Sequence, residues 1–336
     1  MKIFRLILFP FSILYLIITS FRNFLYDNKI LKSYNFDLPI VCVGNLNVGG
    51  TGKTPQIEYL INLLSKKYKI ATLSRGYKRT SKGFILANNN SNAQTLGDEP
   101  FQFFLKFKNV QVAVDADRKN GIEKLLSQPE KPNLILLDDA FQHRKVKAGF
   151  YVLLTAFNDL FTDDFLLPTG NLRESRIGAT RANAIVITKC PENLSEVDQH
   201  KITKKINSNQ PIFFSKIQYD DYIYSSNGKL KLIDTINKGK LIIAGIANPT
   251  PFFDYLKNSN NSILTFPDHH DFTENDLENI KTQAGKKLII TTEKDYVRLK
   301  KHEIKNLYYL PIKSSFLENS VLFDNLILDF INNFKA

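Results

Sequence analysis

Residues 40–54, I-V-C-V-G-N-L-N-V-G-G-T-G-K-T, decide the fold of this chain. Four apolar residues predict a buried strand, the glycine-rich stretch predicts a loop, and Pro55 then suits the first turn of a helix. This strand, loop and helix order is the context of a phosphate-binding loop. Glycines let backbone N–H groups turn towards phosphate oxygens, and the helix N-terminus adds a positive dipole end. The segment therefore predicts an α/β nucleotide-binding domain.

The loop itself supplies the predicted nucleotide contacts, which are Asn47, Val48, Gly49, Gly50, Thr51, Gly52, Lys53 and Thr54. Lys53 can reach the β- and γ-phosphates, and the Thr54 hydroxyl can ligate Mg²⁺. ATP and Mg²⁺ are the predicted cofactors. Asn47 stands where the strict motif has glycine, and asparagine tolerates a left-handed backbone better than other non-glycine residues. The extra glycines indicate a variant loop.

Short β-branched runs recur along the chain and alternate with helical spacing. They are residues 40–43, 70–73, 110–114, 134–137, 151–154 and 184–188. Such alternation predicts βαβ units in a mostly parallel sheet with helices on both faces, since continuous apolar strands are buried on both sides. The first domain is a P-loop-type α/β fold.

Later residues predict a second, smaller α/β unit. Residues 212–233 indicate two strands around a turn at 226–228, followed by apolar runs at 241–246, 262–266, 287–292 and 307–312 and a closing helix at 319–334. We expect a membrane-anchoring helix over 1–30, a nucleotide-binding domain over 31–211, a β-ribbon linker over 212–237 and a smaller α/β domain over 238–336.

Residues 6–18, L-I-L-F-P-F-S-I-L-Y-L-I-I, are too apolar for a soluble surface helix. A cleaved signal peptide, a spanning helix and a half-inserted anchor begun at Pro10 are the three alternatives. No small-residue cleavage site follows the run, which favours an anchor. Arg22, Lys29 and Lys32 follow it and favour a cytoplasmic location for the rest of the chain.

The chain carries a formal net charge of +12 and two cysteines among its 336 residues. The charge fits an anionic partner such as a lipid or a phosphorylated substrate, or merely reflects scattered lysines. No tract of interleaved basic and aromatic residues supports nucleic-acid binding. Two cysteines without a C-x-x-C partner argue against a disulfide framework or a zinc site.

Residues 134–139, L-I-L-L-D-D, end an apolar strand in two carboxylates. Ligands of open α/β sheets bind at the carboxyl ends of the strands, so Asp138 or Asp139 can hold Mg²⁺ there. Other polar residues at predicted strand ends would face the same cleft, and the arginines among them suit phosphate. These residues are Arg75, Tyr77, Arg118, Gln142, His143, Arg173 and Glu174. A loop with His269 and His270 follows a strand of the second unit and suits acid–base work.

Several motifs in order make the chain resemble the tetraacyldisaccharide 4'-kinases, the lipid A 4'-kinase family. They are G-N-x-x-x-G-G-T-G-K-T-P, S-R-G-Y, G-D-E-P (97–100), D-R (117–118), D-D-A-F-Q-H (138–143), L-R-E (172–174), A-G-I-A-N-P (244–249), F-P-D-H-H (266–270) and T-E-K-D (292–295). Ala140 and Ala247 replace expected glycines, a mild departure. The phosphate-binding loop alone indicates only a superfamily, whereas D-D-x-x-Q-H together with F-P-D-H-H is specific.

The resemblance implies transfer of the γ-phosphoryl of ATP to the 4'-hydroxyl of a tetraacyldisaccharide 1-phosphate, giving lipid IVA, at the cytoplasmic face of the inner membrane. It implies that Asp98 and His269 form a catalytic dyad. It also implies phosphate and Mg²⁺ roles for Lys53 and Thr54, metal and water roles for Asp138 and Asp139, and lipid-sugar contacts for Arg75, Tyr77, Arg118 and Arg173.

Two other functions compete. A P-loop switch ATPase, GTPase or metallochaperone would need no anchor, and the N-K-x-D spacing of guanine readers is absent. A nucleic-acid ATPase would use the positive charge, but its binding would have to fall steeply with salt.

Overall fold

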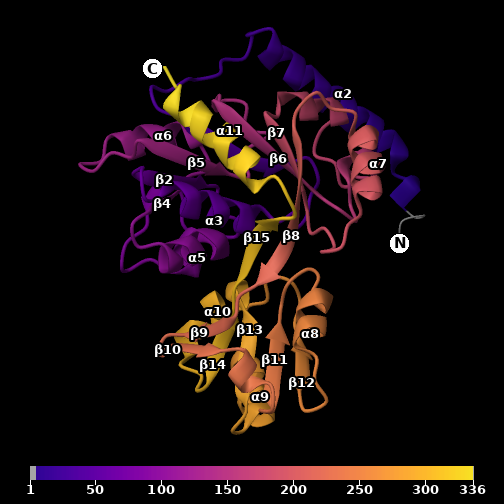
Figure 1. The fold of residues 1–336 in the computed structure, drawn as a ribbon. Coiled ribbons are helices and arrows are strands. Elements are labelled where there is room, and N and C mark those ends of the chain that lie inside the picture. The colour runs from indigo at the N-terminus through magenta and orange to yellow at the C-terminus, as the bar shows by residue number, and fades with distance from the viewer. Residues whose placement is uncertain (1–4, 336) are drawn as a thin grey trace.

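The protein is described by a computed structural model covering residues 5–335, so residues 1–4 of the predicted anchor and Ala336 lie outside the described part. Two α/β units lie end to end, and a long N-terminal helix lies along the larger one (Figure 1).

The larger unit is built on a nine-stranded sheet of order β15-β8-β7-β6-β1-β5-β2-β4-β3. Seven of the strands run parallel, while β3 and β15 pair antiparallel with β4 and β8. The strands are β1 (Ile40–Asn45), β2 (Ile70–Ser74), β3 (Ile85–Leu86), β4 (Gln111–Val114), β5 (Leu134–Asp138), β6 (Phe150–Ala156), β7 (Ala184–Thr188), β8 (Ile212–Tyr219) and β15 (Ile312–Phe316).

Helices cover both faces of this sheet, as predicted. Val41 and Val43 of β1 belong to the core under α3, whereas Ile40 and Cys42 belong to the core under α6. Alternate side chains of a strand point to opposite faces, so burial on both explains the unbroken apolar run. The helices are α3 (Lys53–Leu64), α4 (Ala93–Leu96), α5 (Asp98–Lys106), α6 (Arg118–Leu126), α7 (Glu196–Ile206) and the 3-10 turns Phe161–Asp163 and Arg176–Arg181.

The smaller unit has a six-stranded sheet of order β10-β9-β14-β13-β11-β12. The four strands β11 to β14 are parallel to one another. Strands β9 and β10 form the hairpin whose turn is predicted at 226–228. The elements are β9 (Tyr222–Ser225), β10 (Gly228–Lys231), β11 (Lys240–Ala244), β12 (Ser262–Thr265), β13 (Leu288–Thr292), β14 (Leu307–Leu310), α8 (Thr250–Leu256), α9 (Glu274–Ala284), α10 (Glu293–Leu299) and the 3-10 turns Ile233–Thr235 and Lys300–His302.

The predicted boundaries at 212–237 and 238–336 are corrected by the last elements of the chain. Strand β8 belongs to the larger sheet, and β15 returns to pair with it, so these two strands join the units (Figure 1). Helix α11 (Ser320–Asn332) then packs into the core under α3 through Phe323, Ile327 and Ile331. The sequence predicts this closing helix in the smaller domain, because local sequence cannot say which sheet a terminal helix covers.

Replacing Phe323 with Ala should destabilise the larger domain by about 3–5 kcal/mol, because a fully buried ring would leave a cavity. Phe323 is 0% exposed and packs edge-on against Tyr59 and Phe213. Urea unfolding followed by circular dichroism measures the loss. Val321→Ala, on the exposed side of the same helix, is the control. Equal stability of the two variants would contradict the packing of α11 in this core.

Helix α2 (Phe9–Asp27) docks with its polar side against the larger domain. Ser12 Oγ donates to Leu166 O at 3.0 Å, and Tyr15 OH donates to Arg173 O at 2.9 Å. Asn23 Nδ2 donates to Glu174 Oε2 at 2.9 Å. The opposite side is apolar and exposed, with Phe9, Phe11, Ile13, Leu14, Ile17, Ile18, Phe21 and Phe24. By length and composition α2 is the one described helix that could cross a membrane.

Candidate active site at the domain contact

The phosphate-binding loop joins β1 to α3 as predicted. Gly49 and Gly52 adopt positive φ of 127° and 83°, where a side chain would be strained. Thr188 Oγ1 donates to Thr51 O at 2.8 Å and so fixes the loop against β7. Lys53 Nζ donates to Asn45 Oδ1 at 3.3 Å, which holds the ammonium over the loop.

Asn47 does not need the left-handed backbone that the sequence suggested for it. It is absent from the positive-φ residues of the described chain, is fully buried and forms a bridge with Leu172. Its Nδ2 donates to Asp164 Oδ2 at 3.3 Å, and the next residue's N–H donates to Asn171 O at 2.7 Å. The asparagine therefore ties the loop to residues 164–172, beside the docked helix α2.

Asp138 and Asp139 lie at the end of β5, close to Lys53. Burial, and then the negative charges of Glu99 and Asp139, raise the pKa of Asp138 to about 7. Ser74 Oγ donates to Asp138 Oδ2 at 3.4 Å, while the buried Oδ1 atom has no partner. Asp139 accepts two hydrogen bonds from Arg173 Nη1, at 2.9 and 3.1 Å, and lies 3.6 Å from Lys53 Nζ.

The carboxylate oxygens of Asp138 and Asp139 suit Mg²⁺ better than a metal ion whose ligands all come from the protein. No group of three His, Cys, Asp or Glu residues in the described chain could hold an ion alone. Mg²⁺ binds through one or two protein oxygens and keeps waters and substrate phosphates as its other ligands. The unpartnered Asp138 Oδ1 beside the loop suits that requirement.

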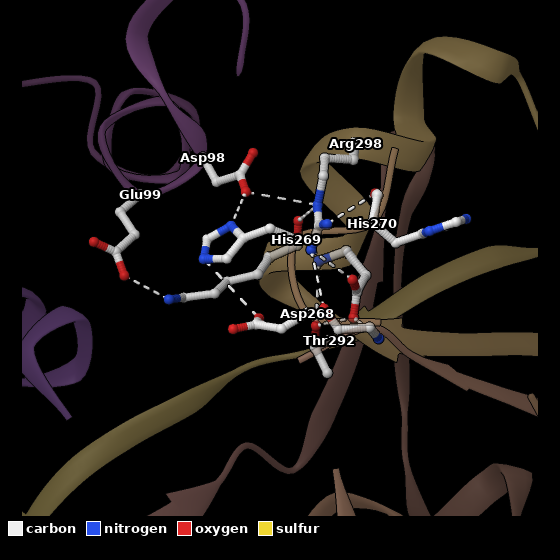
Figure 2. A network of polar contacts seen from close by, with 10 residues as sticks. Asp98, Glu99, Asp268, His269, His270, Thr292 and Arg298 are labelled. Atoms are coloured by element: carbon white, nitrogen blue, oxygen red, sulfur yellow. Dashed lines mark hydrogen bonds and ion pairs between the residues drawn. The ribbon is translucent and has the colours of Figure 1, made fainter. Parts of the chain in front are cut away.

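Asp98 and His269 meet across the two units although 171 residues separate them. His269 Nδ1 lies 2.9 Å from Asp98 Oδ2, in the hydrogen-bonded contact shown in Figure 2. Asp98 begins α5, and His269 follows β12 with a positive φ of 58°. Its other nitrogen, Nε2, lies 3.9 Å from Asp268 Oδ1, and the ring of Tyr77 lies edge-on with centroids 5.8 Å apart.

Further ion pairs line the contact between α5 and α10, and the sequence did not assign them a role. Lys294 pairs with Glu99, and its ammonium lowers the pKa of that carboxyl to about 2. Lys106 lies 2.7 Å from Glu58 and 3.0 Å from Glu293. The motif T-E-K-D was visible after a strand, but nothing in it indicated that Lys294 would reach the other domain.

The other predicted residues fall into two groups. Arg75 and Tyr77 are exposed on the loop after β2, and Arg173 faces Asp139. Arg118 is 3% exposed, and its guanidinium donates to the carbonyls of Asp115, Ala116 and Asp138. The predicted direct substrate contact for Arg118 is therefore corrected: the side chain supports the end of β5 from inside the domain.

Gln142, His143 and Glu174 form a polar layer between the loop and α2. Gln142 Nε2 donates to Asn45 O at 2.9 Å and to Glu174 Oε1 at 3.0 Å. Glu174 is buried and also pairs with Arg181 at 2.7 Å. Burial and the charge of Arg118 lower the pKa of His143 to about 4, which keeps this imidazole neutral.

The arrangement can position two reactants face to face. Lys53 and the loop N–H groups would hold a phosphate chain on the larger domain. The Asp98–His269 pair would take up the proton of a hydroxyl group that lies beside it and accepts the phosphoryl group. Phosphoryl transfer needs such positioning and charge stabilisation more than covalent chemistry.

Comparisons with known proteins agree with this chemistry over nearly the whole chain. The family model described as Tetraacyldisaccharide-1-P 4'-kinase matches residues 4–332. The chain is 63% identical to the Tetraacyldisaccharide 4'-kinase of Flavobacterium johnsoniae, with 98% of each chain covered. It is 44% identical to that of Bacteroides thetaiotaomicron, with 93% of this chain and 89% of the relative covered.

A solved structure is similar as well. The crystal structure of LpxK from Aquifex aeolicus in complex with ATP has a TM-score of 0.80 and 31% sequence identity, and the match covers 98% of this chain and 99% of that one.

Proposed function

Because this chain belongs to the tetraacyldisaccharide-1-P 4'-kinase family, and is thus an ATP-dependent kinase of lipid A biosynthesis, we propose that it transfers phosphate at the contact of Asp98 and His269. The single observation that carries this assignment of the site is the 2.9 Å contact between His269 Nδ1 and Asp98 Oδ2. It joins the nucleotide loop's domain to the second domain at a point where both reactants can meet.

The nucleotide would lie on the loop from Asn47 to Thr54. The N–H groups and Lys53 would bind the phosphates, and Thr54, Asp138 and Asp139 would hold Mg²⁺ directly or through water. The bound ion supplies positive charge to the phosphate oxygens. Arg173 holds the Asp139 carboxylate by two hydrogen bonds, which fixes its orientation towards the loop.

The acceptor would lie beside the dyad, with its 4'-hydroxyl facing the pair. Asp98 and His269 share one short contact, so one of them would orient the other while the pair takes up the hydroxyl proton. The exposed Arg75 and Tyr77 suit the anionic disaccharide 1-phosphate, since an arginine fork matches phosphate geometry. The polar layer of Gln142, His143 and Glu174 would form another wall of the substrate site.

The N-terminal helix would attach the protein to the inner membrane at its cytoplasmic face. Its polar side is hydrogen-bonded to the domain, and its apolar side is free to enter lipid. A helix held flat against its own domain favours insertion into one leaflet rather than a separate span. The net charge of +12 favours an anionic leaflet, which attracts basic proteins.

The double variant Ile13→Asp/Ile17→Asp should lose binding to anionic vesicles, because two apolar side chains that would enter lipid become charged. Both residues are exposed, so the fold should survive. Co-sedimentation with phosphatidylglycerol vesicles measures the change. Ile233→Asp, equally exposed on the other domain, should bind as wild type does. Unchanged sedimentation of the double variant would rule out α2 as the attachment site.

The activity is tested by transfer of label from [γ-³²P]ATP to a tetraacyldisaccharide 1-phosphate in detergent micelles. A labelled lipid product, lost in Lys53→Ala and in Asp98→Ala, supports the assigned site. ATP hydrolysis without a labelled lipid would instead favour a switch ATPase.

A further inference from the structure

Two buried charged residues, Asp295 and Arg298, lie on α10. Figure 2 shows Arg298 next to the dyad residue Asp98. Asp295 is 0% exposed and Arg298 8%. Their side chains pair at 2.7 Å between Arg298 Nη2 and Asp295 Oδ1. A buried ion pair is costly to desolvate and is weak evidence of a stabilising role by itself. The other contacts of the pair lead to the dyad.

Asp295 and Arg298 together hold both polar groups of the Gly245 backbone. The Gly245 N–H donates to Asp295 Oδ2 at 2.9 Å, and Arg298 Nη2 donates to Gly245 O at 3.3 Å. The N–H of His269 donates to that same carbonyl at 3.3 Å. Gly245 therefore links the pair to the backbone of His269, which has the positive φ that a histidine rarely adopts.

The packing around Gly245 leaves this link little freedom. A β-carbon at that position would meet Asp295 Oδ1 at 3.1 Å and Pro267 O at 3.1 Å. Arg298 Nη1 also donates to His270 O at 2.9 Å, on the other side of His269. The loop that carries the imidazole is thus held by backbone hydrogen bonds at His269 and at His270.

Arg298 reaches the other half of the dyad as well. Its Nε lies 3.7 Å from Asp98 Oδ2, the same oxygen that His269 Nδ1 contacts. In Figure 2 the Asp98 carboxylate from α5 lies between the imidazole and the guanidinium. A guanidinium in that place can hold the carboxylate towards the imidazole, because it is a cation with several N–H donors in a fixed geometry.

We propose that Asp295 and Arg298 are positioning residues for phosphoryl transfer: they fix His269 through Gly245, and Arg298 holds the Asp98 carboxylate facing the imidazole. The proposal rests on the dyad's role in the proposed function. Other charged groups near Asp98 are Glu99 on α5, Lys294 and Asp295 on α10, and Asp268 beside His269. Among the described lysines and arginines, Arg298 is the one whose side chain forms an ion pair with Asp98.

The experiment measures kcat and KM for ATP with the full-length enzyme in lipid micelles. Arg298→Gln should lower kcat by about 10- to 100-fold, with KM for ATP within about twofold, because the nucleotide loop lies on the other domain. Arg298→Lys keeps a charge without the fork that holds Gly245 O, His270 O and Asp98 together, so it should restore kcat only in part.

A double-mutant cycle separates positioning from mere stability. In an Asp98→Asn background, Arg298→Gln should cost less than about threefold, because the residue it acts through is already impaired. Asp295→Asn/Arg298→Gln removes both buried charges, so it should keep the wild-type melting temperature while kcat stays low. Arg298→Lys keeps the buried charge, so its kcat still tests the positioning role if Arg298→Gln does not fold.

The outcomes distinguish failure of the dyad assignment from failure of the positioning role alone. If Asp98→Asn itself leaves kcat unchanged, the dyad assignment fails and this inference with it. If Asp98→Asn lowers kcat but Arg298→Gln does not, or if Arg298→Gln lowers kcat equally in both backgrounds, the positioning role alone is overturned.

Discussion

Asp98→Ala should lower kcat by about 10²- to 10⁴-fold, the range lost when a positioned acid–base group is removed. The carboxylate is the partner of His269 Nδ1 at 2.9 Å, so its loss also frees the imidazole to rotate. KM for ATP should stay within about twofold, since the loop from Asn47 to Thr54 contains none of these groups. Initial rates of labelled-lipid formation at saturating ATP measure the effect.

A control for this variant is Asp271→Ala, an exposed carboxylate in the loop that carries His269. It removes the same charge from the same part of the surface and should leave kcat within about twofold. A tenfold fall for Asp271→Ala, or full activity of Asp98→Ala, would show that the loss does not come from the contact with His269.

The local parts of the fold could be predicted from sequence because local chemistry fixes them. The loop before Lys53 has the glycines that its positive φ angles require, and β1 and β5 are continuous apolar runs because both faces of the sheet are covered. Asp138 and Asp139 follow β5 directly, so their place at the sheet edge needed only the strand direction.

The predictions that the structure corrects depend on contacts between residues that are distant in sequence. Helix α11 returns to the first domain because its Phe323 fills that core, which no local pattern reveals. Arg118 was expected to face the substrate, but its guanidinium turns inward to three carbonyls. The pairing of Asp98 with His269 came from the resemblance alone, since neither residue's surroundings point to the other.

The same reasoning explains why Lys294, Asp295 and Arg298 received no role from the sequence. Lys294 and Arg298 lie one turn apart on α10 and face the start of α5, so one helix contact brings Glu99 to Lys294 and Asp98 to Arg298. The site thus depends on how α5 and α10 meet. A change in the angle between the domains would move the dyad and the ion pairs together.

Lys53→Ala should have the second large effect and a different signature. The Lys53 side chain is 11% exposed, and its ammonium lies 3.6 Å from Asp139 Oδ1 and 3.3 Å from Asn45 Oδ1. Removing this charge from the phosphate site should lower kcat by about 10²- to 10³-fold, as losses of one preorganised electrostatic group do. Unlike Asp98→Ala, it should also weaken ATP binding, because in the proposed site the ammonium would contact the phosphates of the ground state as well.

Fluorescence titration with a labelled ATP analogue in the absence of lipid measures that second effect. Lys53→Arg should not restore activity, since a planar guanidinium cannot replace a compact ammonium between Asn45 and Asp139. Lys66→Ala, an exposed lysine just after α3, is the control for net charge and should behave as wild type does. If Lys53→Ala bound the analogue normally and lost only kcat, the ammonium would act in the transition state alone. The position of the Lys53 ammonium beside Asp139 would then not be the place where the ground-state phosphates bind.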